Sequence, residues 1–166
     1  MTCLIYNSAA AVISNGEPIQ ESDERVPVPR HLFGDYARTK AIGERIVIEA
    51  NDDHLRTIAA RSPAIWGVGE NNLLPKIADP VGKRQFVWIN GGRYPYDTSH
   101  VRNVCQGAIL ASENGRGRED YFLTHTQKIA FREFVTGLLN TQNLTTGALS
   151  VPRFIYWSSA AFLEIF

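Results

Sequence analysis

Short, mainly apolar runs alternate with amphipathic stretches along most of the chain. The apolar runs predict buried strands, because a strand of a parallel sheet is covered on both faces. The expected strands are Cys3–Tyr6, Leu55–Arg61, Phe86–Ile89 and Tyr121–Leu123. Apolar residues three and four positions apart predict helices between them. The expected helices are Asp35–Asn51, Leu73–Ile77, Ser99–Glu113 and Ala130–Leu139, with a loop at Trp66–Gly69 and a brief extended piece at Tyr94–Tyr96. Such an alternation is typical of an α/β domain with a largely parallel sheet.

The helix expected over Asp35–Asn51 begins with a residue that can cap it, because the Asp35 carboxylate can accept an orphan backbone N–H. Small side chains would let this helix lie close against a sheet or a partner helix, and charged side chains mark the side facing water. The inward stripe is Ala37, Ala41 and Ile48, with Gly43 as a further small residue. The expected water-facing residues include Arg38, Glu44 and Arg45.

Composition narrows the class of protein. Lys+Arg and Asp+Glu number 17 each, so the formal net charge is zero and gives no reason to expect binding to nucleic acid or to an anionic membrane surface. Cys3 and Cys105 lack metal or redox spacing and are expected to be buried free thiols. The first residues show no basic stretch ahead of an apolar run, so no signal peptide is expected from them, and no uninterrupted apolar run reaches the ~20 residues needed to span a bilayer. The scattered histidines predict no metal site.

The carboxyl-terminal stretch Val151–Phe166 is rich in aromatic and small residues. Because it also holds Arg153 and Glu164, a helix lying on a core or on a membrane surface fits it better than a membrane span. We therefore expect one α/β portion over residues 1–145 and an apolar helix over residues 146–166. A chain that opens on a buried strand also leads us to expect further sequence before it.

Tyr36 and Lys40 stand four residues apart at the start of the first expected helix. At that spacing both side chains project from one helix face. An ammonium held near a phenol stabilises the phenolate, so that the phenol can exchange a proton at neutral pH. Spacing alone leaves a chance pairing open, since Tyr and Lys often share a helix face.

Two strand ends bring further polar residues toward this pair. A parallel sheet binds ligands beyond the carboxyl ends of its strands, where Asn7-Ser8 and Ser62-Pro63 are expected to lie. The Ser8 hydroxyl would then hold a substrate oxygen, Tyr36 would move its proton, and Lys40 would tune Tyr36 while bonding a cofactor ribose. A hydrolase triad built on Asp97 and His100 is the weaker interpretation, because no G-x-S-x-G elbow exists and Asp97 or Ser99 is expected to cap a helix instead.

Tyr36-x-x-x-Lys40 resembles the catalytic signature of the extended short-chain dehydrogenase/reductases, within the NAD-dependent epimerase/dehydratase superfamily. The flanking sequence is similar to the 3β-hydroxysteroid dehydrogenase/isomerase branch over nearly the whole chain. The matching segments are Tyr6-Asn7-Ser8, Tyr36–Ala41, Leu55-Arg56-Thr57, Trp66–Glu70 with Leu74-Pro75, and His100-Val101-x-Asn103 with Ala108–Ala111.

The resemblance implies a fold, a reaction and a set of partners. The fold would be the carboxyl-terminal part of an incomplete Rossmann-like, doubly wound parallel sheet with a small substrate-binding region. The reaction would be NAD- or NADP-linked oxidation of a 3β-hydroxysteroid or a similar secondary alcohol, as in steroid biosynthesis. Tyr36, Lys40 and Ser8 would be catalytic, and Tyr36, Lys40, Ser62 and Pro63 would contact the cofactor. A cytoplasmic protein is expected, with a homodimer and peripheral membrane contact through the terminal helix left open.

Departures from the family pattern leave a second interpretation open. The glycine-rich turn that cradles a dinucleotide pyrophosphate is absent, and Gly67-x-Gly69 does not replace it. Counting from Tyr6, the catalytic hydroxyl position falls on Ala9, with Ser8 one place early, and a one-residue offset turns a side chain to the other face of a strand. The chain is therefore either part of an oxidoreductase or a catalytically inactive, partner-binding piece.

Overall fold

The computed structural model describes residues 2–17, 19, 22–125 and 127–153. Most of the helix expected over residues 146–166 lies outside this range. The chain forms two compact units, one from Met1–Val68 with Thr98–His125 and the other from Gly69–Asp97 with Thr126–Phe166.

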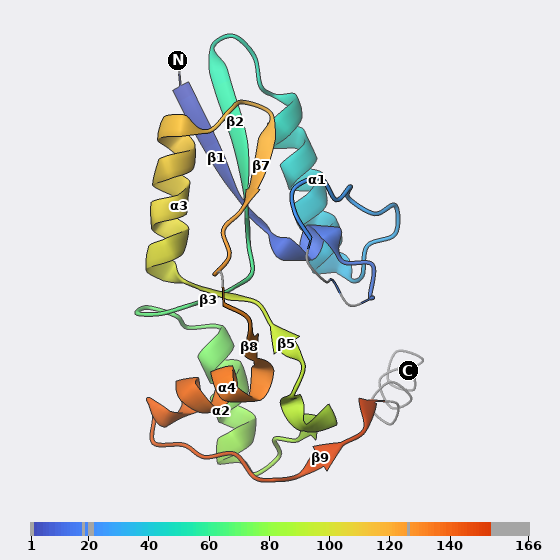
Figure 1. Ribbon diagram of the computed structural model, residues 1–166, viewed down its shortest axis with the longest axis vertical. Coiled ribbons are helices and arrows are strands. Elements are labelled where there is room, and N and C mark those ends of the chain that lie inside the picture. Colours follow the sequence, from blue (N-terminus) through green and yellow to red (C-terminus); the bar gives the residue numbers. More distant parts are fainter. Residues whose placement is uncertain (1, 18, 20–21, 126, 154–166) are drawn as a thin grey trace. The chain divides into compact units, whose positions relative to one another are not determined.

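The first unit is built on a three-stranded parallel sheet. Its strands are β1 (Thr2–Ala9), β2 (Leu55–Ser62) and β7 (Glu119–Phe122), in the order β1-β2-β7. Helices α1 (Asp35–Glu49) and α3 (Val101–Asn114) cover its two faces (Figure 1). The α/β class with a parallel sheet is thereby confirmed.

Close packing of α1 on the sheet depends on a glycine, as its small residues predict. A Cβ at Gly43 would collide with the Tyr6 hydroxyl of β1. The central strand β2 is buried from Thr57 to Ser62, because helices cover both of its faces.

The start of α1 and one of its faces differ from the prediction. Gly34, with φ of 85°, is the N-cap residue, and the Asp35 carboxylate accepts a hydrogen bond from Arg38 Nη2 at 2.6 Å rather than capping the backbone. Glu44, expected to face water, is only 5% exposed. Both predictions were wrong, the second because Glu44 was assigned to solvent by its charge, although its position on the helix faces the sheet and its partners lie on other elements.

A short ribbon in the first unit replaces a predicted loop. Strand β3 (Ala64–Trp66) pairs in parallel with β6 (Thr98–His100). His100 then caps α3, its Nδ1 accepting the Arg102 backbone N–H at 3.2 Å. Its ring also meets the Trp66 ring edge-on, with centroids 4.7 Å apart. Trp66 in a loop and α3 capped by Asp97 or Ser99 were therefore wrong predictions.

The second unit packs α2 (Leu73–Gly82) and α4 (Phe131–Asn140) with two short ribbons. Strand β4 (Trp88–Ile89) pairs in parallel with β9 (Ser150–Val151), and β5 (Pro95–Tyr96) pairs antiparallel with β8 (Ile129–Ala130). A short 3-10 turn, Asn90–Gly92, follows β4. The strand predicted over Phe86–Ile89 is thus shorter and lies outside the three-stranded sheet. The core of this unit includes Trp88, Phe134, Val135 and Leu139.

A carboxylate caps α2 from outside the helix. Glu70 accepts the backbone N–H groups of Asn72, Leu73 and Leu74 at 2.5 to 2.8 Å. Burial alone raises the pKa of Glu70, but these hydrogen bonds and the Lys76 charge outweigh burial, so that its pKa lies below the ordinary value of 4.5. Ionisation of the Glu70 carboxyl group therefore stabilises the folded state.

Replacing Glu70 by alanine should lower the free energy of unfolding of the second unit by about 1 kcal/mol at pH 7. Since the folded-state pKa is lowered, the stabilisation is present above pH ~4.5 and is lost as the pH falls through the folded-state pKa. Hydrogen exchange of the α2 amides, measured at pH 7 and pH 4, checks both the size and the direction. Glu70→Gln, which keeps an acceptor without the charge, should fall between alanine and the wild type; equal exchange in all three proteins would contradict the capping role.

The two cysteines are less buried than predicted. Cys105 is exposed and Cys3 is half-buried, so the expectation of two buried thiols was wrong. No helix in the part of the chain that the structure describes is long and apolar enough to cross a bilayer.

Candidate active site

Tyr36 and Lys40 lie on α1 beside the carboxyl end of β1. Tyr36 stands in the first turn of the helix and is 61% exposed. Lys40, one turn later, is half-buried, and its Nζ donates to the Asn7 carbonyl oxygen at 2.9 Å. The same Nζ lies 5.4 Å from the centroid of the Tyr6 ring. The phenol is open to a ligand, while the ammonium is anchored to the strand.

This arrangement leaves donors at the surface. An ammonium has three N–H groups, of which the Asn7 carbonyl takes one. Because residues four apart lie on the same face of a helix, Tyr36 and Lys40 are neighbours on α1, and the remaining N–H groups of Lys40 can serve a ligand hydroxyl. An exposed phenol beside a fixed cation is suited to proton transfer.

Ser8 is held by α1. Its Oγ donates to Glu44 Oε2 at 2.5 Å, and its residue is 4% exposed. Ala9, the next residue along β1, is equally buried at 5%. The Ser8 hydroxyl is thus engaged inside the unit, and its catalytic role stays a prediction.

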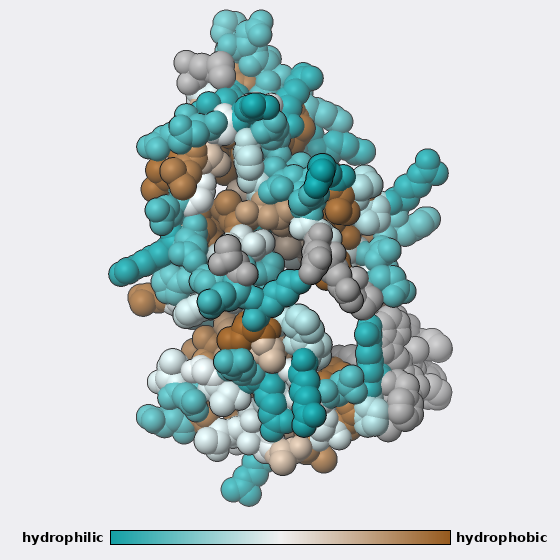
Figure 2. Space-filling view, viewed as in Figure 1, coloured by the Kyte–Doolittle hydropathy of each residue, from teal (hydrophilic) through white to brown (hydrophobic). Residues whose placement is uncertain are grey.

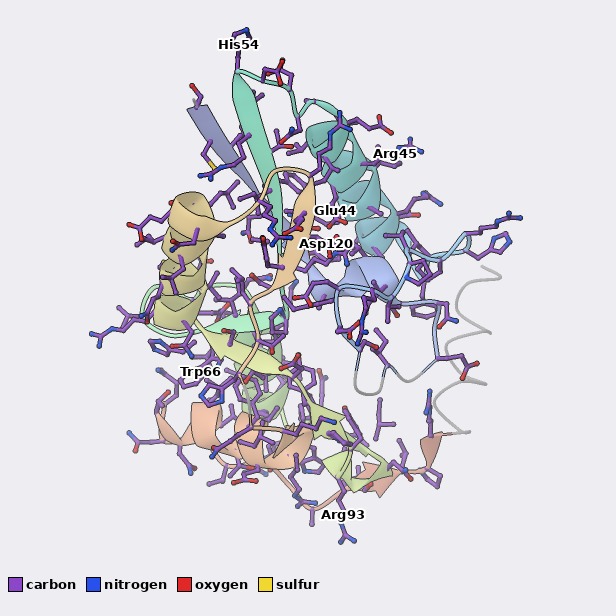
Figure 3. The ribbon with its side chains drawn as sticks, turned by 45° about the horizontal axis from the view of Figure 1, so that its top comes forward. Glu44, Arg45, His54, Trp66, Arg93 and Asp120 are labelled. Atoms are coloured by element: carbon purple, nitrogen blue, oxygen red, sulfur yellow. The ribbon has the colours of Figure 1, made fainter. Side chains whose placement is uncertain are left out.

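Glu44 belongs to a buried charge network that joins α1 to β2 and β7. Arg61 Nη2 donates to Glu44 Oε1 at 2.6 Å, and Arg61 Nε lies 3.2 Å from both carboxylate oxygens. On its other side Arg61 Nη1 lies 2.5 Å from Asp120 Oδ2, an ion contact without hydrogen-bond geometry. The side chains of Arg61 and Glu44 are 4% and 7% exposed. Figure 3 shows Glu44 and Asp120 pointing into the space between α1 and the sheet.

The network carries one guanidinium between two carboxylates. Burial raises the pKa of Asp120; the Arg61 charge opposes that rise, and the Glu44 and Glu24 carboxylates add to it. Glu24 also accepts the Phe122 backbone N–H at 2.9 Å, at the carboxyl end of β7. Negative charge is therefore in excess around Arg61.

Sequence reasoning missed this network, although a signal for it exists. Position 44 follows Ala37 by seven residues and Ala41 by three, which places it on the inward stripe of the helix. Arg61 likewise follows the apolar run Ile58-Ala59-Ala60 within a predicted buried strand. A charge at a buried position needs a partner, so the two signals together point to an ion pair.

Ser62 and Pro63 lie where β2 ends. Ser62 pairs with Ala9 in the sheet register and is 4% exposed. Its Oγ has no hydrogen-bond partner among the described residues. A buried hydroxyl left without a partner can accept or donate to a ligand group, and the cofactor contact predicted for Ser62 and Pro63 stays a prediction.

The described residues include ammonium and hydroxyl groups of the kind that bind a ribose, and no glycine-rich turn of the kind that binds a pyrophosphate. Lys40 offers N–H donors and Ser62 offers a hydroxyl, whereas Gly67 and Gly69 form a turn after β3. A Cβ at Gly67 would meet the side chains of His100 and Val101, so this glycine serves packing. Among the described residues, no group of three or more His, Cys, Asp or Glu side chains is placed to hold a metal ion.

Comparison with known proteins gives consistent matches. The sequence model of the 3-beta hydroxysteroid dehydrogenase/isomerase family matches residues 1–153. A 4-hydroxy-2-methyl-3-oxo-4-farnesyl-3,4-dihydroquinoline-1-oxide ketoreductase from Stigmatella aurantiaca is 38% identical over 90% of this chain and 45% of its own length. A decarboxylating sterol-4-alpha-carboxylate 3-dehydrogenase from Dictyostelium discoideum is 30% identical over 87% of this chain and 44% of its own length.

A solved structure shows the same fold at low identity. The dTDP-glucose 4,6-dehydratase of Bacillus anthracis, in complex with NAD, superposes with a TM-score of 0.69 at 18% identity, over 89% of this chain and 49% of that one. The chain thus spans about half the length of the proteins it matches.

Proposed function

The chain belongs to the 3-beta hydroxysteroid dehydrogenase/isomerase family, and on that premise we propose that the protein acts as an NAD(P)-dependent oxidoreductase. Its substrate is a 3β-hydroxysteroid or a similar secondary alcohol. The two relatives are named a ketoreductase and a 3-dehydrogenase, and both names describe the interconversion of a carbonyl and a carbinol. The choice of a steroid or lipid-like alcohol rests on family membership.

The observation that carries the proposal is the exposed Tyr36 phenol one turn before the anchored Lys40 ammonium. In the oxidative direction Tyr36 accepts the hydroxyl proton of the carbinol as a general base. The Lys40 ammonium, held one turn away by the Asn7 carbonyl, would face the negative charge of the substrate oxygen, and its remaining N–H groups would bond the ribose of the cofactor. Ser62 and Pro63, at the end of β2, complete the cofactor side. A bound NAD or NADP would supply the acceptor for the hydride that leaves the carbinol carbon.

Two measurements on the intact protein, meaning the protein as its source organism makes it, test this proposal. The first is turnover of a 3β-hydroxysteroid with NAD or NADP, and the second is the loss of that turnover when Tyr36 is replaced. Turnover that survives the loss of the Tyr36 hydroxyl would require another base.

The alternative is a partner-binding protein without turnover, and unit 1 offers a specific observation for it. Among the described residues β1 pairs with β2 alone, and an open strand edge invites association. Apolar side chains are also exposed on this unit, with Leu4 at 42%, Ile46 at 58% and Ile109 at 57%. Figure 2 shows such apolar surface among the polar residues of the first unit.

We expect the 166-residue chain by itself to bind NAD and NADP more weakly than about 1 mM, because it contains no glycine-rich turn for the pyrophosphate. Calorimetric titration with each nucleotide measures this, and AMP serves as a control for adenine binding. A micromolar affinity would show that a phosphate site exists outside any glycine motif and would argue against a protein without turnover.

A further inference from the structure

Helix α1 is fastened to strand β1 at two adjacent residues. Lys40 Nζ donates to the Asn7 carbonyl oxygen at 2.9 Å, and Ser8 Oγ donates to Glu44 Oε2 at 2.5 Å. The Asn7 carbonyl and the Ser8 N–H belong to the same peptide group. Two side chains one helical turn apart on α1 therefore meet the two residues that share this peptide group.

The acceptor for Ser8 is itself fixed. The Glu44 carboxylate receives the Nε and Nη2 groups of Arg61. Arg61 in turn contacts Asp120 on β7, and its guanidinium carbon lies 5.5 Å from the centroid of the Phe122 ring. Since Ser8, Glu44 and Arg61 are buried, the carboxylate has little freedom to rotate away from Ser8, and its hydrogen bonds are strengthened by the low local dielectric.

We propose that Ser8 and Glu44 are positioning residues that hold the Asn7 carbonyl in place for Lys40, and so hold the Lys40 ammonium beside Tyr36. Ser8 acts through this peptide group and not on the substrate oxygen, because its single hydroxyl proton is donated to Glu44. The inference rests on the proposed function in that Tyr36 and Lys40 are taken as the reacting pair, but the contact itself exists with or without turnover.

The first test is spectroscopic and uses the 166-residue chain. In the wild type the Lys40 ammonium should give a resolved 1H–15N correlation, because it is held by a carbonyl, and the Asn7 carbonyl carbon should report the accepted hydrogen bond. Ser8→Ala and Glu44→Gln should each broaden or erase the Lys40 signal and shift the Asn7 carbonyl resonance.

Glu49→Gln is the matched control, since Glu49 lies on the same helix with its side chain 69% exposed. It should leave both signals unchanged. Ser8→Ala removes a single hydroxyl group, so this variant tests the positioning role even if Glu44→Gln fails to fold. An unchanged Lys40 signal in folded Ser8→Ala would overturn the proposal.

The second test is a double-mutant cycle on kcat in the intact, active protein. Loss of positioning should lower kcat about 10-fold for Ser8→Ala and about 100-fold for Glu44→Gln, with the KM of the alcohol nearly constant. Because both residues act through one contact, the double variant should lie within about 2-fold of Glu44→Gln. A double variant whose loss equals the product of the two single losses would place Ser8 on the substrate and overturn the inference.

The two tests separate this inference from the proposed function. If the protein oxidises no alcohol, the proposed function fails while the Lys40 and Asn7 signals still decide the positioning role. If turnover depends on Tyr36 but those signals ignore Ser8, only the positioning role fails.

Discussion

Replacing Tyr36 by phenylalanine should lower alcohol oxidation by the intact protein at least ~100-fold, and by as much as ~10⁴-fold, the range that a positioned general base supplies. The change removes one oxygen atom from a side chain that is 61% exposed, so the fold should be unaffected. Cofactor affinity should stay within about 2-fold of the wild type, since most of the binding contacts remain. Steady-state turnover and calorimetric cofactor binding, measured on the same preparation, separate the two effects.

Tyr121→Phe is the matched control for this substitution. The Tyr121 hydroxyl donates to Glu119 and accepts the Arg116 backbone N–H, which ties it to its own strand and the preceding loop. Its loss should leave turnover within a factor of about 2, because no proton of the substrate passes through it. Turnover retained by Tyr36→Phe, or a comparable loss in Tyr121→Phe, would argue against Tyr36 as the base.

Replacing Arg61 by alanine should lower the free energy of unfolding of the first unit by about 3–5 kcal/mol, because it leaves the Glu44 and Asp120 carboxylates without their cation in a buried site. A domain of this size is typically stable by only ~5–15 kcal/mol, so a large part of its stability is at stake. Urea unfolding monitored by circular dichroism, together with hydrogen exchange of the β2 amides, measures the loss in the unit concerned.

Arg45→Ala provides the control. Arg45 lies next to Glu44 on α1 but on its outer side (Figure 3), with its side chain 70% exposed and its Nε 4.0 Å from Glu49 Oε1. Its removal should cost less than ~0.5 kcal/mol, as is usual for exposed pairs. The triple variant Arg61→Met, Glu44→Gln, Asp120→Asn has no unpaired charge and should regain about half of the lost stability. A small loss in Arg61→Ala would mean that water reaches the network.

The sequence alone allowed the class of fold and the main elements to be predicted. The apolar runs at Cys3–Tyr6 and Leu55–Arg61 lie within β1 and β2, and the periodic stretch after Asp35 is α1. These elements follow from local patterns, since a strand covered on both faces needs apolar residues and a helix on a sheet needs an apolar or small-residue stripe. The small residues Ala37, Ala41 and Gly43 likewise predicted a close approach of α1 to a sheet or a partner helix, and the structure shows that β1 is the neighbour at Gly43.

The short two-stranded ribbons could not be predicted from local patterns. Strands of two or three residues, such as β3 and β9, carry no period that distinguishes them from loops. Their pairing with β6 and β4 joins segments far apart in the chain, and only tertiary contacts select those partners.

The candidate site was likewise predictable in part from local spacing and in part only from tertiary contacts. The spacing of Tyr36 and Lys40 determined by itself that the two side chains share one helix face, because the period of an α-helix is fixed by its backbone. Only the tertiary structure decided that Lys40 is held by the Asn7 carbonyl, that Ser8 is bonded to Glu44, and that Glu44 is buried against Arg61. The physical reason is that a polar side chain lies where its hydrogen-bond and charge partners are satisfied, and these partners come from other strands whose positions no local pattern contains.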